Sequence, residues 1–185
     1  MSKWLIGILV VILVLGFWTV GIYNGLVGKD QAVKQNWAQV ETQLQRRYDL
    51  IPNLVSTVKG YARHEKELFE NVAAARSAWT GARSSGEKVK AANDMEGFLG
   101  RLIAVSENYP VLRASENFRA LQDELAGTEN RVSVARMRYN DAVQDYNTTA
   151  RSFPTVALIG LFGFEREKTF FEAAKTATEA PKVVF

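Results

Sequence analysis

His64 is the only histidine in the chain, and it is the first place to look for a metal or acid–base site. The sequence continues His64-Glu-Lys-Glu-Leu68, so the second histidine of the zinc-binding helical motif is absent. No serine lies in a Gly-x-Ser-x-Gly turn, no glycine-rich loop could hold a phosphate, and no spacing singles out a carboxylate pair. Because the chain has no cysteine either, the usual pairs of nucleophile and base cannot be assembled. We therefore predict no catalytic residues, no metal site and no cofactor.

A more informative set of side chains is polar and falls on or beside the apolar faces of the expected helices. Glu129 and Arg136 are about two helical turns apart and share a face, as do Asn140 and Asn147, each of which follows a tyrosine. Buried charges persist only when they are paired, and a lone polar group that faces a core fixes helix register. We therefore predict a structural polar network, with a ligand- or peptide-binding site along the bundle and catalysis as the alternatives. Its candidate members are Arg47, Asp49, Glu65, Glu107, Glu129, Arg136, Asn140 and Asn147.

Arg47 and Glu65 are the two charges that interrupt the apolar pattern of the first helical region. They would lie about 27 Å apart on a straight helix, too far to pair with each other. Each therefore needs a partner on a neighbouring helix. We expect Glu107 or Glu129 opposite Arg47, and Arg136 opposite Glu65.

The elements that position these side chains are predicted from the spacing of apolar residues. Between residues 31 and 79, apolar residues recur at alternating intervals of three and four, which is typical of long helices in coiled-coil-like packing. Pro52 lies inside this pattern, and because proline removes a helical hydrogen bond, we expect a kink or short break near residues 49–52. Two further helices are expected over residues 87–106 and 111–151.

The N-terminal region is apolar over the length of a membrane-spanning helix. No charged residue occurs between Trp4 and Gly28, and the most apolar part, which ends at Tyr23, is about 20 residues or roughly 30 Å of helix. Trp4 and Tyr23 fall near its ends, where amphipathic rings prefer to lie. A cleaved signal peptide is the alternative, but residues 19–21 match a cleavage site poorly. We predict a retained single-pass anchor in the cell (inner) membrane.

The charge balance excludes several classes of partner. The chain has 23 Lys and Arg against 20 Asp and Glu, and its net charge of +3 is too small and too evenly spread for nucleic acid binding. No run of basic residues follows the anchor, so no polybasic lipid-binding patch is present. The charges on the two sides of the anchor are also too even to decide its orientation. The predicted partners are the lipid bilayer, further copies of the chain and an unidentified protein.

The pattern changes after Pro154. Residues 156–164 are apolar but too few to span a bilayer, so they would cover the end of the bundle, lie at the membrane surface or contact another subunit. Residues 165–178 follow a helical pattern, and residues 181–185 are an extended tail. We predict that the apolar segment contributes to a homo-oligomer interface. Its candidate residues are Val156, Leu158, Leu161, Phe162 and Phe164.

Several short motifs are common individually but specific in combination. They are Arg-Arg-Tyr-Asp-Leu-Ile-Pro-Asn-Leu-Val at residues 46–55, Lys-Gly-Tyr-Ala at 59–62, Glu-Asn-Tyr-Pro at 107–110, and the pairs Tyr139-Asn140 and Tyr146-Asn147. In this order they resemble the LemA family of bacterial membrane-anchored proteins, over nearly the whole chain. The resemblance implies one N-terminal transmembrane helix and an antiparallel four-helix soluble domain on the cytoplasmic side. One branch of that family takes part in building magnetosome membranes, and no catalytic residues are assigned that would carry over.

The fold predicted from these observations is all-α, with a transmembrane helix followed by an antiparallel up-and-down four-helix bundle. The expected organisation is an anchor and juxtamembrane turn over residues 1–28, a long-helix bundle over 29–153 and a C-terminal region over 154–185. The expected function is a non-catalytic scaffold that self-associates on the membrane or docks a partner protein. The alternatives are a sensor or a ligand- or peptide-binding module that signals from the membrane, and an enzyme.

Overall fold

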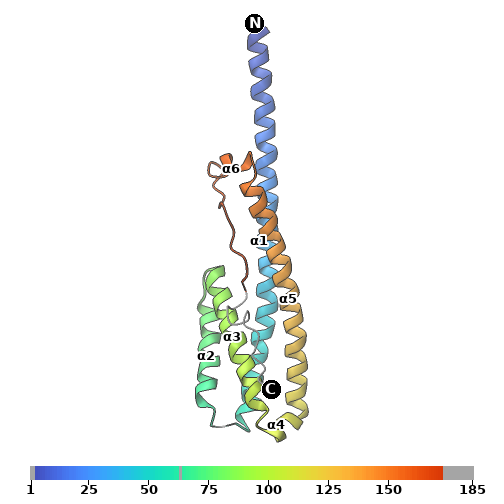
Figure 1. Ribbon diagram of the computed structural model, residues 1–185, viewed down its shortest axis with the longest axis vertical. Coiled ribbons are helices and arrows are strands. Elements are labelled where there is room, and N and C mark those ends of the chain that lie inside the picture. The colour runs from blue at the N-terminus through green and yellow to red at the C-terminus, as the bar shows by residue number, and fades with distance from the viewer. Residues whose placement is uncertain (1–2, 63, 173–185) are drawn as a thin grey trace, which may run out of the picture. The chain divides into compact units, whose positions relative to one another are not determined.

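The computed structural model describes residues 3–62 and 64–172, and over this part of the chain the fold is all-α, without a β-strand. Figure 1 shows the order of the helices along the chain. They are α1 (Lys3–Lys59), α2 (Lys66–Gly81), α3 (Ser85–Ser106), α4 (Pro110–Ala114), α5 (Glu116–Arg151) and α6 (Thr155–Leu158). The prediction of an all-α chain with an apolar N-terminal helix is therefore confirmed.

Contacts divide the chain into two compact units. The first consists of Met1–Gln39 and Met137–Phe170, and the second of Val40–Arg136 and Phe171–Phe185. The long helices α1 and α5 each contribute to both units, because the boundary falls inside them.

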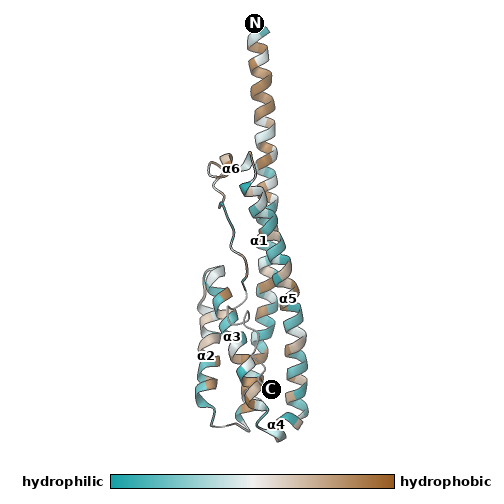
Figure 2. Ribbon diagram, in the orientation of Figure 1, coloured by the Kyte–Doolittle hydropathy of each residue, from teal (hydrophilic) through white to brown (hydrophobic). Residues whose placement is uncertain are grey.

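The first unit starts with the apolar end of α1. Figure 2 shows that this end of the helix is coloured mainly as hydrophobic, and its side chains before Leu26 are exposed except for the half-buried Thr19 and Ile22. In the part of the chain that the structure describes, α1 holds the one stretch that is long and apolar enough to cross a membrane. From Leu26 onward, α1 contacts α5: the ring centres of Trp37 and Tyr139 are 5.2 Å apart, and Lys29 pairs with Asp145 at 2.5 Å. The buried residues of this unit include Leu26, Val33, Tyr139, Val143, Tyr146, Ala150 and Ile159.

The second unit is a helical bundle made from the rest of α1, from α2, α3 and α4, and from the first part of α5. Helices α2 and α3 pack side by side. The spacing of the buried residues of α1 follows the alternating pattern of the sequence. The core includes Val40, Leu44, Ile51, Leu54, Val58, Phe69, Val72, Trp79, Met95, Leu99, Leu102, Phe118, Leu125 and Val132.

Helix α1 continues through Pro52 and ends at Lys59, so the short break considered near residues 49–52 is absent. Proline removes one N–H donor, and the adjacent Ile51 and Leu54 are 2% and 0% exposed, so tertiary packing holds the helix across that position. The helix ends instead beside Gly60, where the backbone N–H groups of Tyr61 and Ala62 both donate to the carbonyl of Val58. The apolar pattern over residues 31–79 thus belongs to two helices, α1 and α2.

The starts of the later helices are fixed by side chains that bind the backbone. The Ser84 hydroxyl accepts a hydrogen bond from the Glu87 N–H at 3.2 Å, and the Glu87 carboxylate accepts one from the Ser84 N–H at 3.1 Å. This reciprocal cap begins α3 two residues before the predicted position. The predicted helix over residues 111–151 is divided, because Ser115 is extended and separates α4 from α5.

The C-terminal region differs most from its prediction. Residues 165–172 are not helical, so the helix expected over residues 165–178 is wrong over the part that is described, and residues 173–178 lie outside it. The extended tail predicted over residues 181–185 also lies outside the described residues. The reason for the missing helix is found in the contacts that α5 makes with this segment.

Candidate functional site

A partly buried charge pair links α1 to α5 in the second unit. The guanidinium of Arg47 contacts the carboxylate of Glu129, and the Arg47 side chain is only 11% exposed. Burial lowers the pKa of Arg47 below its ordinary value, because water no longer solvates the charge. Glu129 is one of the two partners expected for Arg47. The other, Glu107, lies exposed at the C-terminal end of α3.

A second charge pair links α5 to α3 in the same unit. Both terminal nitrogens of Arg136 lie 3.3 Å from Oε2 of Glu96, and the Arg136 guanidinium lies 4.4 Å from the centre of the Phe171 ring. Arg136 was expected to pair with Glu65, but the structure places Glu65 at the start of α2 and gives Arg136 a carboxylate from α3. The sequence does not identify Glu96 as the partner of Arg136, because α3 has other carboxylates that could form the same ion pair.

Tyr48 lies next to these charges and is 2% exposed. Its ring packs against Trp79 at 4.8 Å between centres. Burial raises the pKa of the Tyr48 phenol, so the group stays neutral. Among the described residues, the Tyr48 hydroxyl and the Nε atoms of Arg47 and Arg136 are buried without a hydrogen-bond partner. Such atoms cost stability, so this cluster is better explained by fixing the register of three helices than by strengthening the fold.

The first unit has its own charge cluster, centred on Asp30. This residue is 6% exposed. Its two carboxylate oxygens lie 2.7 Å from Nζ of Lys34 and 3.0 Å from Nζ of Lys168. Lys168 also lies 3.0 Å from the Glu165 carboxylate. Burial disfavours the charge on Asp30, but the two lysines outweigh it, so the pKa of Asp30 is lowered. Burial likewise disfavours the charge on Lys168, but the carboxylates of Glu165 and Asp30 raise its pKa.

Residues 165–169 form an extended segment, here called the strap, that α5 holds through its backbone. The Asn147 amide donates to the Lys168 carbonyl at 2.9 Å and accepts from the Lys168 N–H at 2.7 Å. The hydroxyls of Tyr146 and Tyr139 donate to the carbonyls of Glu165 at 2.6 Å and Thr169 at 2.8 Å. These bonds explain the missing helix, because an extended backbone is needed to offer its N–H and C=O groups to α5.

The remaining candidates of the predicted network lie elsewhere. Asp49 is exposed and accepts a hydrogen bond at 2.8 Å from Gln45, one turn earlier in α1. Asn140 is half-buried on α5. The structure therefore brings Arg47 and Glu129 together, places Arg136 in the same unit and assigns Asn147 to the strap. Sequence reasoning missed the roles of Asp30, Glu96, Lys168 and the two tyrosines, although the repeated Tyr-Asn pairs were a visible signal for part of the strap.

The apolar segment after Pro154 is partly packed and partly exposed. Phe162 and Phe164 lie against the Tyr23 ring, at 5.3 Å and 5.7 Å between ring centres. Gly163 has a φ of 74°, a backbone conformation that favours glycine, and it turns the chain between the two phenylalanines. Val156 and Leu161 are 43% and 82% exposed. Of the other predicted interface residues, Leu158 is half-buried.

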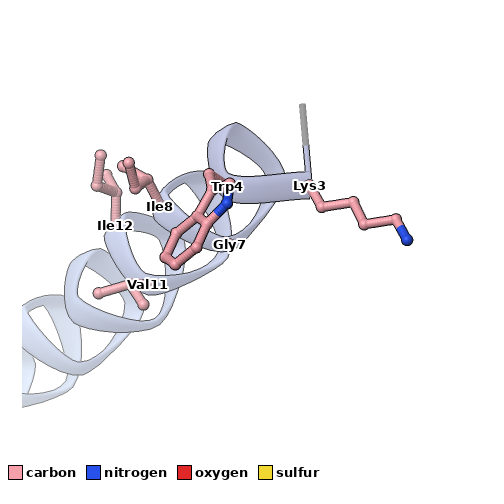
Figure 3. A pocket seen from close by; sticks show the side chains of 6 residues that line it. All are labelled: Lys3, Trp4, Gly7, Ile8, Val11 and Ile12. Atoms are coloured by element: carbon pink, nitrogen blue, oxygen red, sulfur yellow. The ribbon is translucent and has the colours of Figure 1, made fainter. Parts of the chain in front are cut away.

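The candidate membrane span carries a shallow hollow near its N-terminal end. Its lining residues are Lys3, Trp4, Gly7, Ile8, Val11 and Ile12. Figure 3 shows the Trp4 ring over the helix near Gly7 and Val11, and Lys3 directed away from the apolar side chains. This arrangement suits the end of a membrane helix, where a basic side chain extends to the polar boundary and a tryptophan marks it. Across residues 3–62 and 64–172, no group of His, Cys, Asp and Glu is arranged to hold a metal ion.

The fold and these clusters define an α-helical bundle protein with an apolar N-terminal helix, in which most of the buried charges are paired within the chain. The profile of the LemA family matches residues 36–185, and the chain belongs to that family. It is similar to magnetosome protein MamQ 2 of Paramagnetospirillum magneticum, with 26% identity covering 86% of this chain and 67% of that protein. Magnetosome protein MamQ of Magnetospirillum gryphiswaldense is 24% identical over the same shares of the two chains.

Proposed function

We propose that this protein is a membrane-anchored, non-catalytic scaffold. The observation that carries the proposal is the construction of α1, a single helix of 57 residues. Its apolar start is exposed, and its later residues are part of the packed core of both units. A helix of this kind supports a role in which the bilayer holds one end and the bundle presents a surface.

The side-chain chemistry supports a scaffold over an enzyme. The buried guanidinium groups of Arg47 and Arg136 and the buried carboxylate of Asp30 lie in ion pairs between distant parts of the chain, and Tyr48 is held neutral by burial. A catalytic group must reach its substrate, whereas the Arg47, Arg136 and Asp30 side chains are largely buried and are held in ion pairs within the chain. The name of the MamQ relatives and the link between one family branch and magnetosome membranes further support the organisation of membranes or proteins.

The proposal includes self-association and a location in the inner membrane, with the bundle in the cytoplasm. Phe162 and Phe164 contact Tyr23 in their own chain. The apolar surface that residues 156–164 can offer to a second copy is therefore smaller than the sequence suggests. Contacts between bundles remain sufficient in this proposal, since anchoring in one plane raises the effective concentration of each copy.

The test is to isolate the intact chain from membranes and to measure its particle mass in mild detergent. The same preparation is then searched for co-purifying proteins after crosslinking in cells. A scaffold is expected to give either a defined oligomer or a reproducible partner at fixed stoichiometry. A monomer without a partner, or a chain found in the soluble fraction without residues 4–23, would contradict the proposal.

A groove in the second unit favours the alternative of a peptide-binding module. It lies between α1 and α2, where Ile51, Val55 and Phe69 provide apolar lining. Lys59 and Arg76 add positive charge to it. These features suit an amphipathic peptide that carries carboxylates. If the crosslinking experiment captures a partner, mapping the crosslinks to α2 would favour this alternative over self-association.

A further inference from the structure

The boundary of the bilayer on the bundle side of the anchor is fixed by a few residues of α1. Tyr23 is the last aromatic residue of the apolar stretch, and Lys29 is the first charged residue after it. The rings of tyrosine and tryptophan prefer the polar–apolar interface, and lysine prefers water. If α1 spans the membrane, as the proposed function requires, this interface lies close to Tyr23.

The apolar segment after α5 lies at this same level, because it touches Tyr23 directly. Phe162 meets the Tyr23 ring edge-on at 5.3 Å, and Phe164 meets it at 5.7 Å. Figure 1 shows α6 beside α1, at the end of α5. All of these residues belong to the first unit, so their arrangement is internal to it.

Three large apolar side chains of this region are exposed, two of them almost fully. Phe153 is 84% exposed, Leu161 is 82% exposed and Val156 is 43% exposed. The neighbouring Thr155 and Ile159 are 6% and 0% exposed, so α6 is docked by one face and presents another. Exposed apolar side chains that lie close in the sequence are costly in water and favourable in a lipid interface.

We propose that Phe153, Val156 and Leu161 form a second membrane contact, which inserts into the interface of the bilayer that holds the anchor. The contact is shallow, because the segment between α5 and the strap is too short to cross the hydrocarbon layer. Together with α1 it gives the first unit two points of attachment. Two points fix the rotation of that unit about the axis of α1, which a single helix leaves free.

The experiment uses the full-length chain in vesicles of phosphatidylethanolamine and phosphatidylglycerol. Because the chain has no cysteine, a single Leu161→Cys substitution can be labelled uniquely with an environment-sensitive fluorophore. Quenching is measured with nitroxides attached near the lipid headgroup or deep in the acyl chain. Ile12→Cys, in the anchor, is the control for a buried lipid position. Met137→Cys is the matched control for a water-exposed apolar residue of the same unit, with 56% of its surface exposed.

We expect the probe at Leu161 to be quenched several-fold more than the probe at Met137, and more by the shallow nitroxide than by the deep one. A probe at Phe153 should behave in the same way. Equal quenching at Leu161 and Met137, with deep quenching at Ile12, would overturn this proposal and leave the anchor intact. Loss of quenching at Ile12 as well would overturn both. If the Leu161 probe responds to dilution with unlabelled chain but not to lipid nitroxides, the surface contacts a second copy and the proposal is wrong.

Discussion

Replacing Asn147 by alanine should release the strap without unfolding either unit. Asn147 is 7% exposed and makes two hydrogen bonds with the backbone of Lys168, at 2.9 Å and 2.7 Å. Each hydrogen bond contributes a net of about 0.5–1.5 kcal/mol, so the two together contribute about 1–3 kcal/mol to holding the strap. A tenfold change in an equilibrium constant corresponds to about 1.4 kcal/mol, so the strap should open about 5- to 150-fold more often.

Hydrogen exchange of the full-length chain in detergent measures this opening at individual amides. The Lys168 amide should exchange faster in Asn147→Ala by the stated factor, while amides in the core of α5 should keep their protection. Thr149→Ala is the matched control, because the Thr149 hydroxyl donates at 3.0 Å to the carbonyl of Asp145 within the same helix. An unchanged rate at Lys168 in the Asn147 variant would refute the view that the side chains of α5 hold the strap. Equal acceleration in the control would refute its specificity.

Three further predictions concern the charge clusters. Arg47→Met should lower the free energy of unfolding by about 2 kcal/mol, a value between those of exposed and buried pairs, because Glu129 is 37% exposed. The control Asp49→Asn should change the free energy of unfolding by less than about 0.5 kcal/mol, and equal urea midpoints for the two variants would contradict the pairing. Tyr48→Phe should leave stability unchanged or raise it by about 1 kcal/mol, since it removes a buried hydroxyl without a partner, and a large loss in urea unfolding would show that the hydroxyl is bonded. Because the pKa of Asp30 is lowered in the folded chain, Asp30 contributes its full stabilisation above the unfolded pKa of about 3.8 and loses it as the pH falls through the lower folded value. Stability should therefore fall less steeply with acid in Asp30→Asn than in the original chain. Identical acid-unfolding profiles would contradict the two lysine contacts.

The sequence predicts the helices well because their apolar residues repeat with the helical period, and burial follows that period in α1 and α5. It also narrows the partner of Arg47 to two carboxylates, because a buried charge on one helix requires an opposite charge on another. It does not identify Glu96, since the choice among the carboxylates of α3 depends on how that helix is rotated. The end of α1 beside Gly60, in place of a break at Pro52, depends similarly on packing around Ile51 and Leu54.

The strap is beyond prediction from local pattern for a different reason. It begins the stretch of residues 165–178 whose apolar spacing predicts a helix, but its backbone is bound by Tyr139, Tyr146 and Asn147 from a distant part of the chain. A hydrogen bond from a side chain to a remote backbone leaves no periodic trace in the segment that receives it. The tertiary contact therefore overrides the local preference for helix.

The strap lies along α5, and the two segments have a different rise per residue. Tyr146 and Tyr139 bind carbonyls near its two ends, at Glu165 and Thr169. Seven helical residues advance by about 10 Å and four fully extended residues by at most about 13 Å, so the two tyrosines and the two carbonyls are separated by similar lengths. Adding or deleting one residue between Glu165 and Thr169 would shift one of the two carbonyls by about 3.3 Å relative to its tyrosine, which is enough to break that hydrogen bond unless the side chain moves. Insertions and deletions should therefore be tolerated less well between Glu165 and Thr169 than after the strap. The number of residues between these two carbonyls sets the position on α5 at which the following residues begin.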